Sequence, residues 1–203
     1  MRRIGITLAT LALIAFVSCK NQNEKADKEG DMTEETMKMD STQADSMENK
    51  KMEAKSVSVT LESKSDSKAT GQVLFSQQNG IVNMRARISG LTPGTHAIHI
   101  HEKADCSSPD GKSAGGHWNP TFEPHGKWGA AEGYHKGDIG NFVADAEGNG
   151  TISLQTDQWC IGCGDEKKDI LGKGIIVHEG TDDFTSQPSG DAGARVSCGG
   201  IIQ

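Results

Sequence analysis

Hydrophobic and polar residues alternate along much of the chain from Ser56 onward, beginning with SVSVTL at 56–61. An alternation with a period of two is typical of a β-strand that buries one face. Similar short runs recur between glycine-rich turns: ATGQVLFS (69–76), GIVNMRARI (80–88), HAIHIHE (96–102), GTISLQ (150–155), GIIVHE (174–179) and ARVSCGGII (194–202). An Asn-Gly pair at 79–80 predicts a hairpin between the second and third runs. Helical periodicity is weak, so the pattern predicts an all-β sandwich or barrel.

One long stretch breaks this pattern. The thirty-nine residues between His101 and Asn141 show little regular alternation. A connection of this length without secondary structure needs a function or an internal clamp in a compact domain. It contains three histidines and an aspartate: His117, His125, His135 and Asp138. We therefore expect a bound metal ion to organise the stretch.

The N-terminus has a different character. Two arginines precede an apolar run at 4–17, which is too short to span a bilayer and fits a secretory signal. The run ends in Phe-Val-Ser-Cys, which resembles a bacterial lipobox, with cleavage before Cys19 and lipid attached to that cysteine. The sequence thus predicts a lipoprotein signal peptide at 1–18. A plain signal peptide cut nearby is the alternative.

The next segment separates this signal from the alternating runs. Residues 20–55 contain no aromatic and no β-branched aliphatic residue, and Lys, Glu, Asp, Ser and Met dominate. Such a segment cannot bury enough apolar surface to fold by itself. We expect a lipidated Cys19 and a disordered tether at 19–55, followed by one folded domain at 56–203.

Five of the seven methionines of the chain lie in this tether, at positions 32, 37, 39, 47 and 52. Thioethers are soft ligands that favour Cu(I), and methionine also consumes oxidants. The tether is therefore read as a solvated spacer, with copper collection and oxidant scavenging as the alternatives.

Charge excludes one class of partner. Two arginines lie in the signal, and the tether has seven lysines against ten acidic residues, which leaves −6 of the net charge of −7 on residues 56–203. Phosphate contacts need clustered Lys and Arg, so an acidic domain is a poor nucleic-acid binder.

The cysteines point to an oxidising compartment. Five are present: Cys19, Cys106, Cys160, Cys163 and Cys198. If the first carries lipid, an even number of four remains in an exported protein, which favours disulfides.

All seven histidines lie within the expected domain. On a strand through 96–102, His99 and His101 point to the same face and His96 to the other, so the first two can share a metal. His178 ends another apolar strand. The three histidines and the aspartate of the long stretch suit a four-coordinate zinc site, whereas imidazole-rich sets of tetragonal geometry suit Cu(II).

In this order, HAIHIHE, GGHWNP, HGKW, YHKGDIGN, VHEGTDD and GARVSCGG resemble the copper/zinc superoxide dismutase family over nearly all of residues 56–203. The resemblance implies an eight-stranded Greek-key β-barrel with long metal-binding loops. It also implies one copper and one zinc per subunit, and dismutation of superoxide to oxygen and hydrogen peroxide by one-electron steps at copper. The implied copper ligands are His99, His101, His117 and His178, and the implied zinc ligands are His117, His125, His135 and Asp138. His117 would be a shared imidazolate that takes a proton when its bond to copper breaks.

Other roles follow from the same resemblance. Asp182 would hydrogen-bond to one copper ligand and one zinc ligand and fix their orientation, with Asp183 as the alternative. Arg195 would offer fixed donors to a small anion beside the copper. His96 would be structural, and Cys106 and Cys198 would form the family disulfide.

The segment 159–174, WCIGCGDEKKDILGKG, departs from the family by its length and by a Cys-x-x-Cys at Cys160 and Cys163. Glycine follows the second cysteine, so this is not a haem attachment site. A short-range disulfide that closes the loop tip is favoured, and a redox-labile pair that responds to peroxide is the alternative.

A second departure concerns electrostatics. The loop from His178 to Arg195 is short, and it lacks the charged residues that steer anions in many members of the family. Attraction of superoxide to an acidic domain must then come from the metals, from Arg195 and from nearby lysines, with Lys112, Lys127, Lys136 and Lys173 as candidates. A reaction rate that falls with added salt is the expected result.

The sequence thus predicts an exported superoxide dismutase on the periplasmic or cell-surface side of a bacterial membrane, held there only by its N-terminal lipid. Superoxide is the expected small-molecule partner, and a monomer and a homodimer are both compatible with the sequence. The alternative is a copper- or zinc-buffering lipoprotein with the same fold and no turnover. Arg195 and the complete set of copper ligands argue against it, because metal storage needs no arginine to guide an anion.

Overall fold

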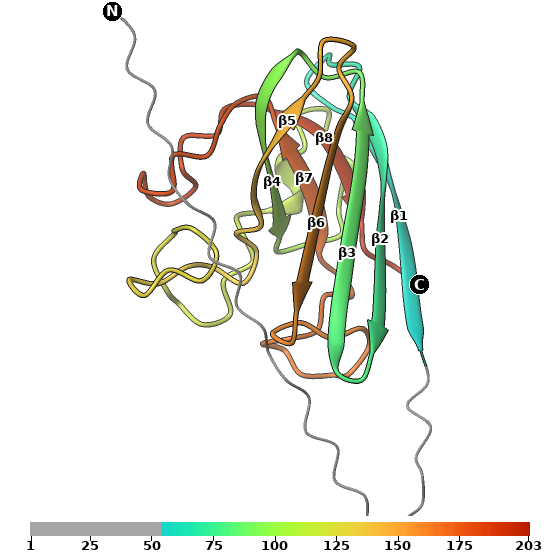
Figure 1. Cartoon of the computed structure of the whole chain (residues 1–203), viewed down its shortest axis with the longest axis vertical. Helices are drawn as coiled ribbons and strands as arrows, with labels where there is room; N and C mark the ends of the chain where they lie inside the picture. The colour runs from blue at the N-terminus through green and yellow to red at the C-terminus, as the bar shows by residue number, and fades with distance from the viewer. Residues whose placement is uncertain (1–53) are drawn as a thin grey trace, which may run out of the picture. The chain divides into compact units, whose positions relative to one another are not determined.

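The computed structural model describes residues 54–203, which form a closed barrel of eight strands (Figure 1). The strands are β1 (Lys55–Ser63), β2 (Thr70–Gln78), β3 (Ile81–Ser89), β4 (Gly94–His101), β5 (Gly140–Ala144), β6 (Gly150–Thr156), β7 (Gly174–His178) and β8 (Arg195–Gly200). The expected all-β barrel is confirmed. Among the described residues, no helix is long and apolar enough to cross a membrane.

The order of the strands around the barrel is β1-β2-β3-β6-β5-β4-β7-β8, and β8 pairs back with β1. All neighbouring strands are antiparallel. β4 follows β3 along the chain without lying beside it, and β7 follows β6 in the same way. These two crossovers make the connectivity a Greek key.

Alternation along the strands fills the barrel. In β3 every second residue is buried, namely Val82, Met84, Ala86 and Ile88. The turn between β2 and β3 consists of Asn79 and Gly80, with φ of 52° and 78°. Positive φ at both positions matches the twist of a hairpin, and Asn-Gly adopts it at low cost. The hairpin expected from the sequence is therefore present in its tightest form.

Seven of the eight strands were predicted from the alternation, and β5 is the strand that was not. It has only five residues, and it shares a single partner pair with β6, Ala144 with Gly150. Its pairing with β4 is longer and runs from Gly94 with Ala144 to Ile98 with Gly140. A strand this short carries too few alternating positions to be recognised from its sequence.

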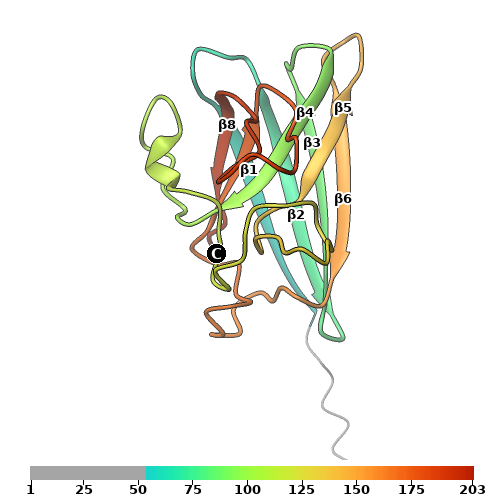
Figure 2. The same ribbon diagram turned by 90° about the vertical axis from the view of Figure 1, so that its left-hand side faces the viewer.

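Two loops make one part of the barrel unlike the rest. The long loop (102–139) contains a single 3-10 turn at Lys112–Ala114, and the C-terminal loop (179–194) joins β7 to β8. Both lie on the side of the barrel where β4 runs (Figure 2). Because the loops cover it, β7 is buried at all five positions and β4 at every position from His96 to His101.

The predicted signal peptide at 1–18, the lipidated Cys19 and the tether at 19–55 lie outside the described residues, apart from the last two positions of the tether. The first strand begins at Lys55. The structure therefore bears on the domain alone.

Candidate metal centre

The first group of histidines forms where β4, β7 and the long loop meet. His99 and His101 are on the face of β4 opposite to the core residues Ile98 and Ile100. β7 pairs with β4. The long loop also contacts β4, because His117 in the loop forms an isolated β-bridge with His101 at the end of that strand. The four buried side chains each offer one ligand atom, and these atoms lie within 4.8 Å of one another: His99, His101, His117 and His178.

The second group lies next to the first and shares one ring with it. It consists of three histidines and one aspartate from the long loop, all of them buried: His117, His125, His135 and Asp138. The ring centroids of His117, His125 and His135 are 5.3 to 5.6 Å apart. All seven residues predicted as metal ligands are thus brought together in the two sets that the sequence suggested.

Hydrogen bonds fix the orientation of each ring in the first group. The N–H groups donate to oxygens on the surrounding loops: His99 Nε2 to Asp182 Oδ2 (2.9 Å), His101 Nδ1 to the Gly115 carbonyl (3.0 Å), His117 Nδ1 to Asp138 Oδ1 (2.8 Å) and His178 Nδ1 to the Gly193 carbonyl (3.3 Å). A histidine that binds a metal usually donates its other ring N–H in this way. The rings of His99, His101 and His178 therefore have one nitrogen held by the protein and one directed inward. The Nδ1 of His117 instead bonds to Asp138, which is itself a member of the second group described above.

The inward nitrogens provide the test of whether these residues fit metals. Within residues 54–203, six buried ring nitrogens have no hydrogen-bond partner: His99 Nδ1, His101 Nε2, His117 Nε2, His125 Nδ1, His135 Nδ1 and His178 Nε2. A buried polar atom without a partner is costly, and native proteins rarely keep six together. Metal ions at both groups would satisfy all of them.

The spacing in the second group fits the same conclusion. His125 Nδ1 is 3.0 Å from Asp138 Oδ2, and His135 Nδ1 is 3.2 Å from Asp138 Oδ1. Four ligands placed tetrahedrally at about 2.0 Å from one zinc ion are separated by about 3.3 Å. The second group therefore has the composition and the spacing of a tetrahedral zinc site, and the first group has the imidazoles of a copper site.

Asp182 connects the two groups. Its Oδ2 accepts from His99 Nε2, and its Oδ1 accepts from His125 Nε2, both at 2.9 Å. Its backbone is held by the side chain of Asn141 on β5, which donates to its carbonyl and accepts from its N–H. Asp183 is exposed and instead accepts from Thr185 and Ser186. The geometry thus selects Asp182 over its neighbour.

Two further residues of the C-terminal loop support the second group, and sequence reasoning missed both. The side chain of Gln187 accepts from the N–H of His125 and donates to its carbonyl, each at 2.9 Å. Gly190 has φ of 67°, and a Cβ at this position would collide with Asp182 Oδ1. The only sign of the close approach in the sequence was a glycine in an Asp- and Ser-rich turn. The bond from Gln187 to His125 joins two distant loops and leaves no local signal.

The electrostatics keep three rings of the first group neutral. Burial lowers the pKa of His101 and of His178 well below 6.5, and the neighbouring histidine rings lower it further. Burial also lowers the pKa of His117 to about 4, although Asp138 opposes the shift. A neutral imidazole has a free lone pair at its unprotonated nitrogen. These three rings are therefore in the form that binds a metal at neutral pH.

The second group is more polar. Burial opposes the charge of His125, but Asp138 and Asp182 outweigh it and raise the pKa of this ring to about 9. Burial would also raise the pKa of Asp138, yet its contacts with His117, His125 and His135 hold it far below the usual range. At neutral pH the metal-free second group thus holds an ionised carboxylate and a protonated His125.

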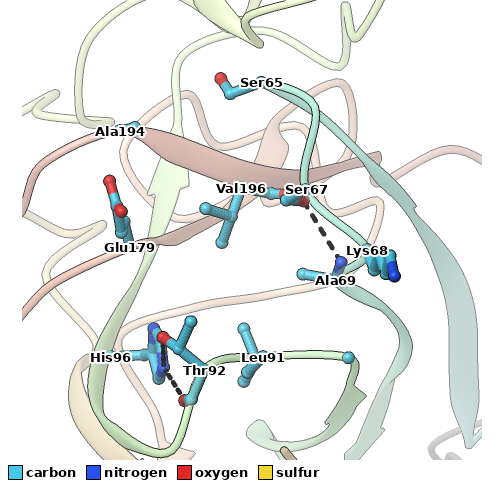
Figure 3. A pocket seen from close by; sticks show the side chains of 11 residues that line it. Ser65, Ser67, Lys68, Ala69, Leu91, Thr92, His96, Glu179, Ala194 and Val196 are labelled. Carbon is cyan, nitrogen blue, oxygen red and sulfur yellow. Dashed lines mark hydrogen bonds between the residues drawn. The ribbon is translucent and has the colours of Figure 1, made fainter.

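His96 belongs to neither group. Its Nδ1 is 2.9 Å from the carbonyl of His178 and its Nε2 is 2.8 Å from the carbonyl of Thr92 (Figure 3). It thereby ties the start of β4 to the end of β7. A cavity of about 350 Å³ borders His96, with Leu91, Glu179 and Val196 among its lining residues, and no ligand of either group lines it.

Arg195 begins β8 directly beside the first group. Its Nη1 donates to the carbonyl of Gly111 at 2.9 Å, which fixes the half-buried guanidinium. Among the candidate lysines, Lys112 is next to this contact and pairs with Asp110 at 3.0 Å. Lys136 instead bonds to Gln158, and Lys173 is over the ring of Trp118. Arg195 is therefore bonded to the residue that directly precedes Lys112 in the chain.

The cysteines form two disulfides. Cys106 of the long loop is joined to Cys198 of β8 over a separation of 92 residues, which fastens the start of that loop to the barrel. Cys160 is joined to Cys163 in the Cys-x-x-Cys loop (157–173), which connects β6 to β7. In chain-entropy models, the stabilisation that a disulfide gives the folded state increases with the length of the loop that it closes. The Cys106–Cys198 disulfide is therefore expected to stabilise the domain more than the Cys160–Cys163 disulfide.

Fold and site together define a β-barrel metalloprotein with two adjoining metal sites that share one histidine. The family model described as "Copper/zinc superoxide dismutase (SODC)" matches residues 69–201. The chain therefore belongs to the copper/zinc superoxide dismutase family, and copper and zinc are the metals that the family implies.

Individual relatives agree with this assignment. A superoxide dismutase (Cu-Zn) from Caulobacter vibrioides is 39% identical over 140 residues, which cover 67% of this chain and 80% of the relative. A "superoxide dismutase-like protein YojM" from Bacillus subtilis is 34% identical over 143 residues, or 68% of this chain and 71% of that protein. The crystal structure of a double mutant of a SOD-like protein from Bacillus subtilis superimposes with a TM-score of 0.63 at 34% identity, covering 72% of this chain and 97% of that one.

Proposed function

We propose that this protein is a superoxide dismutase, which converts superoxide to oxygen and hydrogen peroxide at a copper site supported by a zinc site. The observation that carries the proposal is the pair of complete ligand groups, in which six buried ring nitrogens have no hydrogen-bond partner and the only oxygens near two of them belong to Asp138, a member of the same group. The four histidines of the first group would hold copper, and the second group would hold zinc. Copper supplies the one-electron chemistry, and zinc has no redox role.

The residues of the chain perform the remaining tasks. Arg195 is fixed beside the first group by its bond to Gly111, and its guanidinium stays charged at any relevant pH. It can therefore bind a small anion through fixed donors. The rings of His99, His101 and His178 are buried and locked, so that little reorganisation accompanies the change in copper charge.

His117 has a second task, because the product needs protons. Its Nδ1 is held towards Asp138, while its Nε2 faces the first group without a partner. Nε2 can thus carry a proton whenever it is not bound to metal and pass it to the reduced oxygen species.

The direct test is the rate of superoxide disproportionation by protein loaded with one copper and one zinc. We expect fast turnover from the loaded wild type, and His178→Ala should abolish it, because this change removes one copper ligand and leaves the second group complete. Zinc content of the variant, measured by mass spectrometry, serves as the control. A loaded wild type without activity would instead favour the metal-buffering alternative.

We also propose that the protein is exported and held at a bacterial membrane by lipid on Cys19, with the domain on the periplasmic or cell-surface side. The apolar run at 4–17 and the following Phe-Val-Ser-Cys support this proposal. Labelling with a fatty acid should mark the wild type and not Cys19→Ala, and the variant should be released from membranes. Equal labelling of both would contradict lipidation at this cysteine.

A further inference from the structure

The Cys-x-x-Cys loop holds the second metal group from outside, through Trp159. This side chain is 1% exposed, and its indole N–H donates to the carbonyl of Lys136 at 2.9 Å. Lys136 directly follows His135, one of the residues that would hold zinc. Trp159 also packs edge-on against Trp128, with ring centroids 5.3 Å apart, and Trp128 is three residues beyond His125. One buried indole thus contacts the backbone beside one zinc residue and the segment beside another.

Gln158 holds the other side of His135. Its Oε1 accepts from the hydroxyl of Tyr134 at 3.0 Å and from the ammonium of Lys136, and its Nε2 donates to the Tyr134 hydroxyl at 2.6 Å. The residues before and after His135 are therefore both bound by Gln158, and the residue after it is also bound by Trp159. Among the described residues, the bonds of His135 itself run to Asp138. The flanking bonds of Gln158 and Trp159 therefore add to Asp138 in holding the position of His135.

The Cys-x-x-Cys loop is in turn anchored to the barrel beside the β2–β3 hairpin (Figure 1). The N–H of Ile161 donates to the side chain of Gln77, and its carbonyl accepts from Lys55 Nζ. The carboxylate of Asp169 accepts from the backbone of Gly162, Gly164 and Leu171. The Cys160–Cys163 disulfide closes this turn immediately after Trp159. The loop is thus held in place by several bonds, and a change in its conformation would move Trp159 and the residues beside the zinc ligands that Trp159 contacts.

We propose that Gln158 and Trp159 are positioning residues for zinc, and that the Cys160–Cys163 disulfide is a redox site that braces them. The proposal rests on the zinc group of the proposed function and does not depend on superoxide turnover. Loss of either positioning residue should let His135 move and speed the release of zinc. Reduction of the disulfide should do the same to a smaller degree, because the bonds of Asp169 and Ile161 remain.

The two sulfur atoms of this disulfide differ in solvent exposure, and this difference determines which of them a reductant can attack. Cys163 is exposed, whereas Cys160 is 5% exposed. A thiolate of a small dithiol can therefore attack the sulfur of Cys163; the S–S bond breaks and Cys160 leaves, taking up a proton. The second thiol of the reductant then resolves the mixed disulfide. The protein gains two electrons and two protons, and the reductant becomes a disulfide.

The first experiment measures the rate of zinc release from copper- and zinc-loaded protein to a chromogenic chelator. Trp159→Phe keeps the aromatic ring and removes the donor. This variant and Gln158→Ala should each release zinc up to about tenfold faster, the lower end of the range for residues that bond a metal ligand directly, because these two hold only the residues beside His135. Gln155→Ala is the matched control, because Gln155 is exposed on β6, just before the Cys-x-x-Cys loop. Release at the wild-type rate in both test variants would overturn the proposal.

A second readout separates positioning from general destabilisation. With cobalt(II) in place of zinc, the visible absorption bands report ligand geometry, and they should change in Trp159→Phe. The increase in melting temperature on zinc binding should also shrink in this variant, since weaker binding contributes less stabilisation. A variant that lowers the melting temperatures of the metal-free and zinc-loaded forms equally, with unchanged cobalt bands, would show a structural role only and overturn the positioning claim.

The redox claim is tested on the same loaded protein. A dithiol is applied until mass spectrometry of alkylated peptides shows free thiols at Cys160 and Cys163 while Cys106 and Cys198 remain joined. Zinc release should then accelerate, but by less than the roughly tenfold expected for the positioning variants, because the bonds of Asp169 and Ile161 still hold the loop. The double variant Cys160→Ser, Cys163→Ser should match this faster rate with or without the dithiol. An unchanged rate after selective reduction would refute the brace.

Discussion

Asp182 accepts a hydrogen bond from His99 Nε2 at 2.9 Å, and this leaves Nδ1 as the nitrogen of that ring that faces the first metal group. Asp182, which is 83 residues away in the chain, thus selects the tautomer of His99 that carries its proton on Nε2. A carboxylate in this role both aims the imidazole and strengthens it as a ligand.

Replacement of Asp182 by leucine should weaken both sites at once. The variant loses the acceptor for His99 and for His125, so each ring can rotate or change tautomer. We expect the affinity for copper and for zinc to fall by about 10- to 100-fold, the range typical of lost outer partners of metal ligands. Competition with chelators of known affinity measures both values.

Asp183→Leu is the matched control, since this exposed neighbour bonds only to nearby loop residues among the contacts described above. Metal affinities within twofold of the wild type are expected. If the two variants behaved alike, the connection between the groups through Asp182 would be wrong.

Arg195→Ala should reduce kcat/KM for superoxide by about tenfold, because it removes the fixed cation beside the first group. Copper and zinc contents should not change, as the guanidinium bonds only to Gly111 among the hydrogen bonds that the described chain shows for it. Arg195→Lys should recover part of the rate, since it keeps the charge and loses the planar donors. Pulse radiolysis with metal analysis of the same samples checks both expectations.

Salt should slow the wild-type enzyme. Residues 56–203 carry a net charge of −6, so attraction of a small anion depends on the local cations Arg195 and Lys112, and ions in solution screen these fields within about 10 Å at 0.1 M. The rate constant should fall as sodium chloride is raised, and the slope should be smaller in Arg195→Ala. A flat or rising dependence in the wild type would contradict local steering.

Zinc binding should release a proton. In the metal-free protein the pKa of His125 is raised to about 9, so at pH 7.5 this ring carries a proton that an ordinary histidine would largely have lost. A metal at Nδ1 must displace it. Titration of zinc into metal-free His178→Ala, which retains only the second group, should release about one proton at pH 7.5 and progressively less above pH 9.

The measurement is calorimetry in two buffers of different ionisation enthalpy. Copper(II) binding at the first group of the wild type provides the comparison, because the pKa values of His101, His117 and His178 are lowered and these rings are already neutral. Proton release of similar size at both groups would contradict the assigned protonation states.

Much of the barrel and of the metal groups could be predicted from the sequence, because strand alternation and the spacing of histidines on one strand are both visible within short segments. Alternation revealed seven strands, and the spacing of His99 and His101 on one strand face indicated a shared metal. Other features could not be found in this way. β5 has too few residues to show alternation, and the bonds from Gln187 to His125 and from Trp159 to Lys136 join side chains to the backbone of distant loops. Such contacts depend on the tertiary placement of the loops.

His117 is a member of both metal groups, and this double membership has a thermodynamic consequence. Any effect of zinc on the affinity for copper must be matched by an equal effect of copper on the affinity for zinc, because the two binding free energies belong to one cycle. The two groups would share this one ring, so occupation of the second group would change the charge carried by a ligand of the first. The second site therefore acts as an effector of the first, and a cell that supplies zinc changes how much copper the protein retains.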